Sequence, residues 1–483
     1  MNNEVKRTNG WPLAGRVIGV ILLATLVGCP ALPETAEEDE AVEVIPPPPL
    51  SLLLVDTPGI APLIERQWSA RRDGQLNSTE ITFEDLQAND FREVKENDVV
   101  IYPVELIGEL VSRKLLLEVP KITWNSDELN KKELLRKSRT RFVQYGGDAW
   151  GTPLGSPQLV MMYREDVLKQ LGEEPPKTWE QFFSLVNKLK VSELKDSEGN
   201  SLPVAVDIPL ADRWASVSFL AMCAADIRYR GKLSTVFENS DMQPLINQKP
   251  FVAKLSALKK AADESDLRWS PADAYRRMLE GDCAIAIGWP SMGLLEKAPP
   301  ANEHVRVARL PGSADWFDFD EQVFVRRDKD DPIHVDLLGF DGRMASVAEN
   351  SGNTLTAFEF ISWLSSKQIS LLYLPQSASG AAFRASHLGN MARWTGEGLA
   401  PDAIDQYSEI LKDADLSNTS FVFPRIPGVR DYRSGLDAAI QDCLSGGTDP
   451  QSALDNVVQQ WKGVTNNQGL ENQKSWLRKS VGF

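Results

Sequence analysis

Three polar residues stand where short apolar runs of the sequence end. Asp56 and Thr57 close the run Ser51–Asp56 (SLLLVD), and Glu105 follows a second run, Asp98–Tyr102 (DVVIY). Both runs have the length and composition of buried strands. Ligands of open α/β sheets bind beyond the carboxyl ends of strands, so we expect these three side chains to form hydrogen bonds with a polar ligand.

Motifs of known catalytic sites are nearly absent. There is no P-loop, no His-Glu-x-x-His pair and no Gly-x-Ser-x-Gly elbow. Two Ser-x-x-Lys matches occur, Ser192–Lys195 and Ser256–Lys259, without the partner motif Lys-Thr-Gly. A carboxylate pair for glycoside hydrolysis stays open, because acidic residues are abundant and no pattern singles out two of them. His304, His334 and His387 lack metal-ligand spacing. We therefore expect no catalytic residue, no metal and no cofactor.

Composition excludes one class of partner. The net charge of −16 argues against nucleic acid, since phosphate contacts need a basic face. A chain of 483 residues with 42% apolar content favours two or more domains with sizeable cores. Three cysteines beside Cys29, namely Cys223, Cys283 and Cys443, are too few for a disulfide framework. One bond among them and free buried thiols both stay open.

The N-terminal residues are typical of an exported protein. A basic segment precedes the apolar run Val17–Val27, which is shorter than the roughly 20 residues that cross a bilayer. The letters LVGC, ending at Cys29, resemble the bacterial lipobox, whose cysteine carries lipid. This resemblance predicts a lipoprotein signal peptide over residues 1–28 and a membrane anchor at Cys29. An ordinary signal peptide or a short anchor is the alternative.

An acidic and proline-rich segment follows. It holds six acidic residues before the run Pro46–Pro49. Like charges and prolines favour an extended chain, so we expect residues 29–49 to form a tether. Two or more acyl chains hold a soluble domain on a membrane, which makes this order suit a tethered, exported protein.

Strands and helices alternate in the segment that must position the polar residues. Helical spacing of apolar residues predicts a helix over Ile60–Arg71 and another over Leu106–Leu115. A second strand is expected over Ile81–Leu86. This alternation implies βαβ units with a parallel sheet, and hence an α/β fold.

Later segments add further helices and one exception. Thr178 and Gln181 form a capping-box pattern ahead of an apolar helical stripe. Ala284–Ile287 is expected to be a strand that ends at Trp289. The segment Gly312–Asp336 has no clear period, and we interpret it as an insertion or a long loop. Three more helices are predicted: Thr354–Ser366, Tyr432–Leu444 and Pro450–Trp461.

Four segments, in this order, resemble the solute-binding proteins of ABC importers, in the sugar-binding group that includes maltose-binding protein. They are DAWGTPLGSPQLVMMYREDVLKQLGEEPPKTWEQF, AYRRMLEGDCAIAIGWPS, TLTAFEFISWLSSKQ and FVFPRIPGVRDYRSGLDAAIQDCLSGGTDPQSALDNVVQQW. The resemblance implies an α/β, two-lobed periplasmic-binding-protein architecture, with a hinge of crossing segments and a central ligand cleft. Lobe 1 would hold residues 50–153 plus 339–388, and lobe 2 residues 154–338 plus 389–483.

The resemblance also points to aromatic site residues. Sugars need flat aromatic faces for stacking and in-plane polar groups for hydrogen bonds. Trp289 matches the family's cleft tryptophan, Trp214 stands near a helix start where the family often places an aromatic, and Trp150 lies beside the crossover at Thr152–Gly155.

Three polar residues complete the expected site. Asp148 and Gln158 flank the same crossover and could bond to hydroxyl groups. Arg384 follows a glycine turn and could reach the cleft or serve the hinge.

The function implied is capture of a small polar ligand, a mono- or oligosaccharide, by cleft closure, and delivery to an ABC permease. We expect a monomer on the periplasmic or cell-surface side of the membrane. A surface enzyme acting on polysaccharide and a ligand sensor on the same fold are the alternatives.

Overall fold

The computed structural model describes residues 49–71, 75–295, 302–396 and 398–482. The predicted signal peptide, the predicted lipidation site at Cys29 and the predicted tether, apart from Pro49, lie outside the described residues. Among the described residues, no helix combines the length and the apolar character needed to span a membrane. The described residues belong to one compact unit by their internal contacts.

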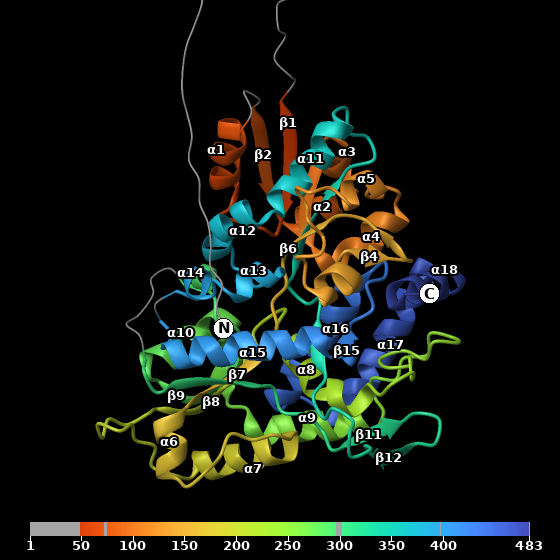
Figure 1. The fold of residues 1–483 in the computed structure, drawn as a ribbon. Helices are drawn as coiled ribbons and strands as arrows, with labels where there is room; N and C mark the ends of the chain where they lie inside the picture. Colours follow the sequence, from red (N-terminus) through yellow and green to blue (C-terminus); the bar gives the residue numbers. More distant parts are fainter. Residues whose placement is uncertain (1–48, 72–74, 296–301, 397, 483) are drawn as a thin grey trace, which may run out of the picture. The chain divides into compact units, whose positions relative to one another are not determined.

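Five strands form the first sheet, in the order β2-β1-β3-β14-β6. Figure 1 shows β1 and β2 of this sheet beside helix α1. Strand β1 runs parallel to β2 and β3, whereas β14 is antiparallel to β3 and β6. The two strands expected to carry polar residues at their ends, β1 and β3, are therefore neighbours. The strands are β1 (Leu50–Val55), β2 (Leu76–Ile81), β3 (Val99–Pro103), β6 (Thr152–Gly155) and β14 (Arg343–Val347).

Helices α1 (Ala61–Arg71) and α11 (Thr354–Leu364) pack against β2 and β14 respectively and match two predicted helices closely. The helix predicted over Leu106–Leu115 is present as a 3₁₀ turn (Val104–Leu106) followed by α4 (Ile107–Ser112). It ends early because Lys114 adopts a left-handed conformation, with φ 56°.

The strand predicted over Ile81–Leu86 is wrong. The second strand is β2, which ends at Ile81, and helix α2 (Phe83–Ala88) begins directly after it. The hydroxyl of Thr82 caps α2 by accepting a hydrogen bond from the Asp85 N–H at 3.1 Å. Strand β2 is an edge strand with a mostly polar sequence, LNSTEI, so it has no apolar run to detect.

Four strands form the second sheet, in the order β10-β7-β9-β8. Strand β9 pairs antiparallel with β7 and parallel with β8, and all six of its residues are buried. It contains the predicted strand that precedes Trp289. The strands are β7 (Val160–Arg164), β8 (Val204–Asp207), β9 (Cys283–Gly288) and β10 (Val305–Arg309).

Helices surround this second sheet. Thr178 and Gln181 form the predicted capping box at the start of α7. The other helices of this region are α6 (Glu165–Gln170), α8 (Ala215–Ile227), α9 (Lys249–Ala261) and α10 (Pro271–Glu280); α7 spans Trp179–Lys190. The α/β fold is confirmed, while the bounds of the two lobes stay a prediction.

The segment Gly312–Asp336 is not a long loop. It contains an antiparallel hairpin of β11 (Asp315–Asp318) and β12 (Val323–Arg326), and β13 (Asp336–Leu338) follows. Trp316 stacks on Tyr229 at 4.3 Å between ring centroids, with an interplanar angle of 9°. Contacts with residues distant in sequence, such as that between Trp316 and Tyr229, hold this segment in place. A local hydrophobic period therefore did not reveal its strands.

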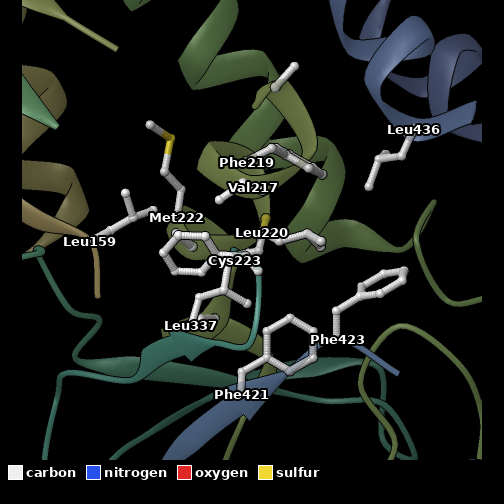
Figure 2. Close-up of a cluster of buried hydrophobic side chains, with 14 of the residues drawn as sticks. Leu159, Val217, Phe219, Leu220, Met222, Cys223, Leu337, Phe421, Phe423 and Leu436 are labelled. Atoms are coloured by element: carbon white, nitrogen blue, oxygen red, sulfur yellow. The ribbon is translucent and has the colours of Figure 1, made fainter. Parts of the chain in front are cut away.

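Helix α8 is buried along its whole length and organises the largest core. Figure 2 shows its side chains facing Leu337 of β13 and Phe421 of β15 (Ser420–Val422). The C-terminal helices α16 (Val429–Leu444) and α17 (Pro450–Gln468) contact α8 and α9, and both contain predicted helices. The cysteines Cys223, Cys283 and Cys443 are buried and free, so no disulfide joins them.

Helix α15 (Pro401–Leu416) packs against β10 of the second sheet. The other elements used below are η2 (Ser138–Phe142), β4 (Gln144–Tyr145), β5 (Asp148–Ala149), α5 (Lys121–Trp124) and α18 (Leu470–Val481).

Candidate ligand-binding site

The ends of β1 and β3 carry the predicted polar residues close to the start of α16. Asp56 has a positive φ of 46°, and its carboxylate accepts hydrogen bonds from the Phe83 N–H at 3.0 Å and from Arg430 at 2.8 Å. The hydroxyl of Thr57 donates to the carbonyl of Val55 at 2.7 Å. Asp56 therefore joins β1, α2 and α16 at one place.

Glu105 is the most deeply placed carboxylate of this group. It lies in the 3₁₀ turn after β3, is 4% exposed, and forms ion pairs with Arg430 (2.6 Å) and Arg433. Burial by itself would raise the pKa of Glu105, but the positive charges of Arg433, Arg430 and Arg213 outweigh it and lower that pKa. Glu105 is thus held ionised between two arginines of α16.

Helix α16 presents three charged residues from one face, since positions three and four apart are neighbours on a helix. Arg430 and Arg433 point to the strand ends, and Asp437 accepts a hydrogen bond from the N–H of Ser216 at 2.6 Å. Arg433 also donates to the carbonyl of Arg213 at 2.7 Å. One helix face therefore links the edge of the first sheet to the start of α8.

A second pair of arginines, Arg343 at the start of β14 and Arg213 ahead of α8, lies on either side of Asp341. Arg343 donates to the hydroxyl of Thr57 (2.9 Å), to the carbonyl of Asp56 (2.7 Å) and to the carboxylate of Asp341 (3.0 Å). Arg213 lies 3.8 Å from the same carboxylate and is 48% exposed at its side chain. Asp341 thereby connects β14 to the segment ahead of α8.

Three aromatic rings lie beside this network. Trp214 precedes α8, Trp289 follows β9, and Phe340 precedes β14; their centroids are 5.7 to 6.4 Å apart. Trp214 is half-buried, whereas Trp289 is fully buried and its indole N–H has no partner among the described residues. Trp214 is the partly exposed ring of the three, and it packs against the buried rings of Trp289 and Phe340.

A cavity of about 300 Å³ opens between these groups. Three arginines of the ion-pair network described above line this cavity: Arg213, Arg430 and Arg433. The other lining residues are Phe83, Glu84, Gln87, Asp212, Asp431, Ser434, Asp437, Ala438 and Gln441. A neighbouring, more open hollow shares Asp212, Ala438 and Gln441 and adds Trp214. Of the residues predicted for the site, Trp214 therefore lines one of the two adjoining spaces. Asp56 and Glu105 contact the arginines of the cavity but line neither space, and Thr57 and Trp289 also line neither.

Four predicted residues lie elsewhere. The indole of Trp150 donates to the carbonyl of Tyr145 at 3.0 Å, and Asp148 is exposed in the β4–β5 hairpin. Gln158 donates to Asp336 at 3.0 Å, beside Lys137. None of these lines the two spaces at the strand ends.

Arg384 is 1% exposed and donates to the carbonyls of Ser365 (2.7 Å), Leu129 (2.9 Å) and Asn130 (3.3 Å). These bonds give it a structural role in joining three segments of chain. It too is absent from the lining of the two spaces.

Sequence reasoning missed Arg213, Arg430, Arg433, Asp341 and Phe340. The spacing of the α16 arginines, three residues apart, was visible and marks one helix face. The turn GFDGR at residues 339–343 was the other available signal.

The Ser-x-x-Lys motifs do not form catalytic pairs. Ser192 donates to the carbonyl of Lys188, while Lys195 pairs with Glu193. Ser256 likewise donates to the carbonyl of Val252. In the part of the chain that the structure describes, no group of three or more His, Cys, Asp or Glu residues is placed to hold a metal ion.

Comparisons with known proteins agree with this architecture. A search of curated proteins gave no match. Maltose-bound MalE3 of T. maritima has the same fold, with a TM-score of 0.64, 16% identity, and coverage of 86% of this chain and 100% of that chain. An ABC substrate-binding protein from Listeria monocytogenes in complex with cycloalternan gives 0.63 at 16% identity, covering 87% and 99%.

A solute-binding protein of an ABC transporter from Agrobacterium vitis S4, with bound D-mannitol, gives a TM-score of 0.62 at 14% identity, covering 88% of this chain and 99% of that chain. At such identities the likeness shows the fold alone. The sequence itself matches the family model of bacterial extracellular solute-binding proteins over residues 80–369, more than half of the chain. The protein therefore belongs to the family of bacterial extracellular solute-binding proteins.

Proposed function

We propose that the protein captures a mono- or oligosaccharide, or a sugar alcohol, at the ends of β1 and β3 and delivers it to an ABC permease. The observation that carries this proposal is that Arg430 and Arg433 line a cavity next to the hollow that Trp214 lines. Ion pairs with Asp56 and Glu105 hold these arginines in place. A hydroxyl-rich ligand needs fixed charges and acceptors around its rim and an aromatic face beneath it. The three relatives named above were solved with a sugar or a sugar alcohol bound, which supports this ligand class.

The chain's own residues would act by binding alone. The ligand would face Trp214, while the arginines of α16, held in place by Asp56 and Glu105, form hydrogen bonds to its hydroxyl groups. A ligand that contacts groups beyond both sheets favours the arrangement in which those groups are close, so it shifts the population toward the closed form. The permease would recognise that form.

Titration calorimetry and thermal unfolding with a panel of sugars and sugar alcohols test the proposal. A ligand present at about 100 times its Kd should stabilise the protein by about 2.7 kcal/mol. Trp214→Ala should weaken binding at least about tenfold, as expected for loss of a stacking face. The half-buried Trp124 of α5 offers a matched control, and Trp124→Ala should leave the affinity unchanged.

Two results would contradict the proposal. If no member of the panel binds, the ligand class is wrong. If the stabilisation decays while the sugar is consumed, the protein is an enzyme that acts on it.

We also propose that Cys29 carries the lipid anchor and that the protein is a monomer. Cys29→Ser should move the protein from the membrane fraction to the soluble fraction, and light scattering should give the mass of one chain. Loss of sugar uptake on deletion of the protein would support the permease as its partner; unchanged uptake with a lost transcriptional response would identify a sensor instead.

A further inference from the structure

A second cavity, of about 440 Å³, has an unusual charge. Five of its sixteen lining residues are Arg or Lys, and none is Asp or Glu. The whole chain has 68 acidic and 52 basic residues, so this lining runs against the composition of the protein. The five cations, here called the basic pocket, are Arg136, Arg141, Arg228, Arg425 and Lys479.

Segments far apart in sequence supply these cations. Arg136 and Arg141 lie in or next to η2, and Arg228 ends α8. Arg425 lies between β15 and α16, and Lys479 lies in α18. The fold therefore gathers like charges that repel one another, and such an arrangement lasts only if something offsets the repulsion.

Among the described residues, no carboxylate forms an ion pair with the side chains of these five cations. The carboxylate of Asp415 does accept a hydrogen bond from the backbone N–H of Arg136 at 2.9 Å. Arg136 donates to the carbonyls of Asp415 (2.9 Å and 2.6 Å) and Ser417 (2.5 Å). Arg228 donates to the carbonyl of Lys232. The ammonium group of Lys479 stands 4.2 Å from the ring of Trp476. Carbonyls and rings orient these cations but do not neutralise them.

Arg425 shows the consequence most clearly. It is 3% exposed and donates to the carbonyls of Phe142 (2.6 Å) and Gln144 (3.0 Å), while its Nε has no partner among the described residues. Burial, opposed by Tyr145 and Tyr102 and reinforced by the charge of Arg141, lowers the pKa of Arg425 to about 10. A buried charge with an unused donor is costly unless an anion approaches it.

We propose that the basic pocket binds a phosphate-bearing anion. Guanidinium groups match phosphate oxygens with paired hydrogen bonds, and the cavity has room for two linked phosphate groups. The source is either a free phosphate ester or diphosphate, or the headgroup of an anionic phospholipid of the membrane to which the protein is expected to be tethered. The basic pocket is separate from the ligand site proposed at the ends of β1 and β3, here called the strand-end site, since the two cavities share no lining residue.

The test uses the full chain and two probes. Inorganic pyrophosphate is titrated calorimetrically at fixed ionic strength, and vesicles of phosphatidylglycerol in phosphatidylcholine are compared with phosphatidylcholine alone. The variants are Arg141→Gln, whose side chain is exposed, and Arg141→Gln with Arg228→Gln. Lys260→Gln removes an exposed cation outside the pocket and is the matched control.

We expect one pyrophosphate per chain, binding about tenfold weaker in Arg141→Gln, undetectable in the double variant and unchanged in Lys260→Gln. Binding to phosphatidylglycerol vesicles but not to pyrophosphate, with the same dependence on the variants, supports the headgroup source. Equal binding by the wild type and the double variant, or no binding of either probe, overturns the proposal. Circular dichroism of each variant confirms that it is folded.

Discussion

Arginines gather in two regions of this molecule under opposite electrostatic conditions. At the strand ends, Arg430 and Arg433 are paired with Glu105, and the pKa shifts of Glu105 favour its charged form. In the basic pocket, Arg425 is as deeply buried as Arg433, yet its side chain donates hydrogen bonds only to carbonyls and its pKa is lowered. Burial is therefore similar in the two regions, and the presence of a carboxylate makes the difference.

The presence or absence of a carboxylate partner indicates which kind of ligand each group of arginines can bind. A guanidinium already paired with a carboxylate is fixed in place and offers its remaining donors to neutral hydroxyl groups. One without a counter-charge gains most from an anion. The strand-end site thus suits a neutral polar solute, and the basic pocket suits a phosphate.

The largest effect should follow from removing the carboxylate that distinguishes the strand-end site. Glu105→Gln leaves Arg430 and Arg433 buried without their shared partner, which should lower the free energy of unfolding by about 3–5 kcal/mol. Urea denaturation measures it. Glu84→Gln, an exposed residue of the cavity that Arg430 and Arg433 line, should change this free energy by less than about 0.5 kcal/mol. Equal effects of the two substitutions would contradict the role of Glu105 as the carboxylate that stabilises the buried arginines.

Removing an arginine from each region compares them directly. Arg433→Gln should cost about 1.5–3 kcal/mol, the usual contribution of a hydrogen bond to a charged group. Arg228→Gln should cost less than about 1 kcal/mol, because the change also removes repulsion from Arg141. Chemical denaturation at neutral pH measures both free energies of unfolding. A greater loss of stability in Arg228→Gln than in Arg433→Gln would contradict the comparison.

The pH dependence of stability should report the same carboxylate. Since folding lowers the pKa of Glu105, the folded state binds this proton more weakly than the unfolded state. Its stabilisation is complete above the ordinary carboxyl pKa of about 4.3 and is lost as the pH falls toward the folded value. The wild type should therefore lose stability between about pH 5 and pH 3 more steeply than Glu105→Gln. Parallel curves for the two proteins would exclude Glu105 as the titrating group.

Salt should produce the smallest effect. Raising sodium chloride from about 50 mM to about 300 mM screens repulsion among the cations of the basic pocket and should stabilise the wild type by a few tenths of a kcal/mol. The variant with Arg141→Gln and Arg228→Gln should gain less, because it has less repulsion to screen. Tm values at matched salt concentrations give the comparison, and a larger gain in the variant would show that the repulsion lies elsewhere.

Local sequence signals predicted much of the fold. The strand at Ser51–Asp56, the capped helix after Thr178 and the strand before Trp289 each depend on residues a few positions apart, and all three are confirmed. The α/β class follows from their alternation. Strand β2 escaped prediction because its sequence is mostly polar and its partner β1 lies about 25 residues earlier. The hairpin of β11 and β12 escaped because β12 exposes apolar residues and Trp316 of β11 packs on Tyr229, which is distant in sequence.

The two arginine regions show which part of the site could not be predicted from the sequence. It placed Asp56 and Glu105 beyond their strands, because strand ends can be recognised from short apolar runs. Only the tertiary structure brought Arg430 to these carboxylates, and only it gathered Arg136 and Arg425 around one cavity with no acidic residue. Secondary structure depends on interactions over a few residues, whereas the partner of a charge depends on distances in space between segments hundreds of residues apart.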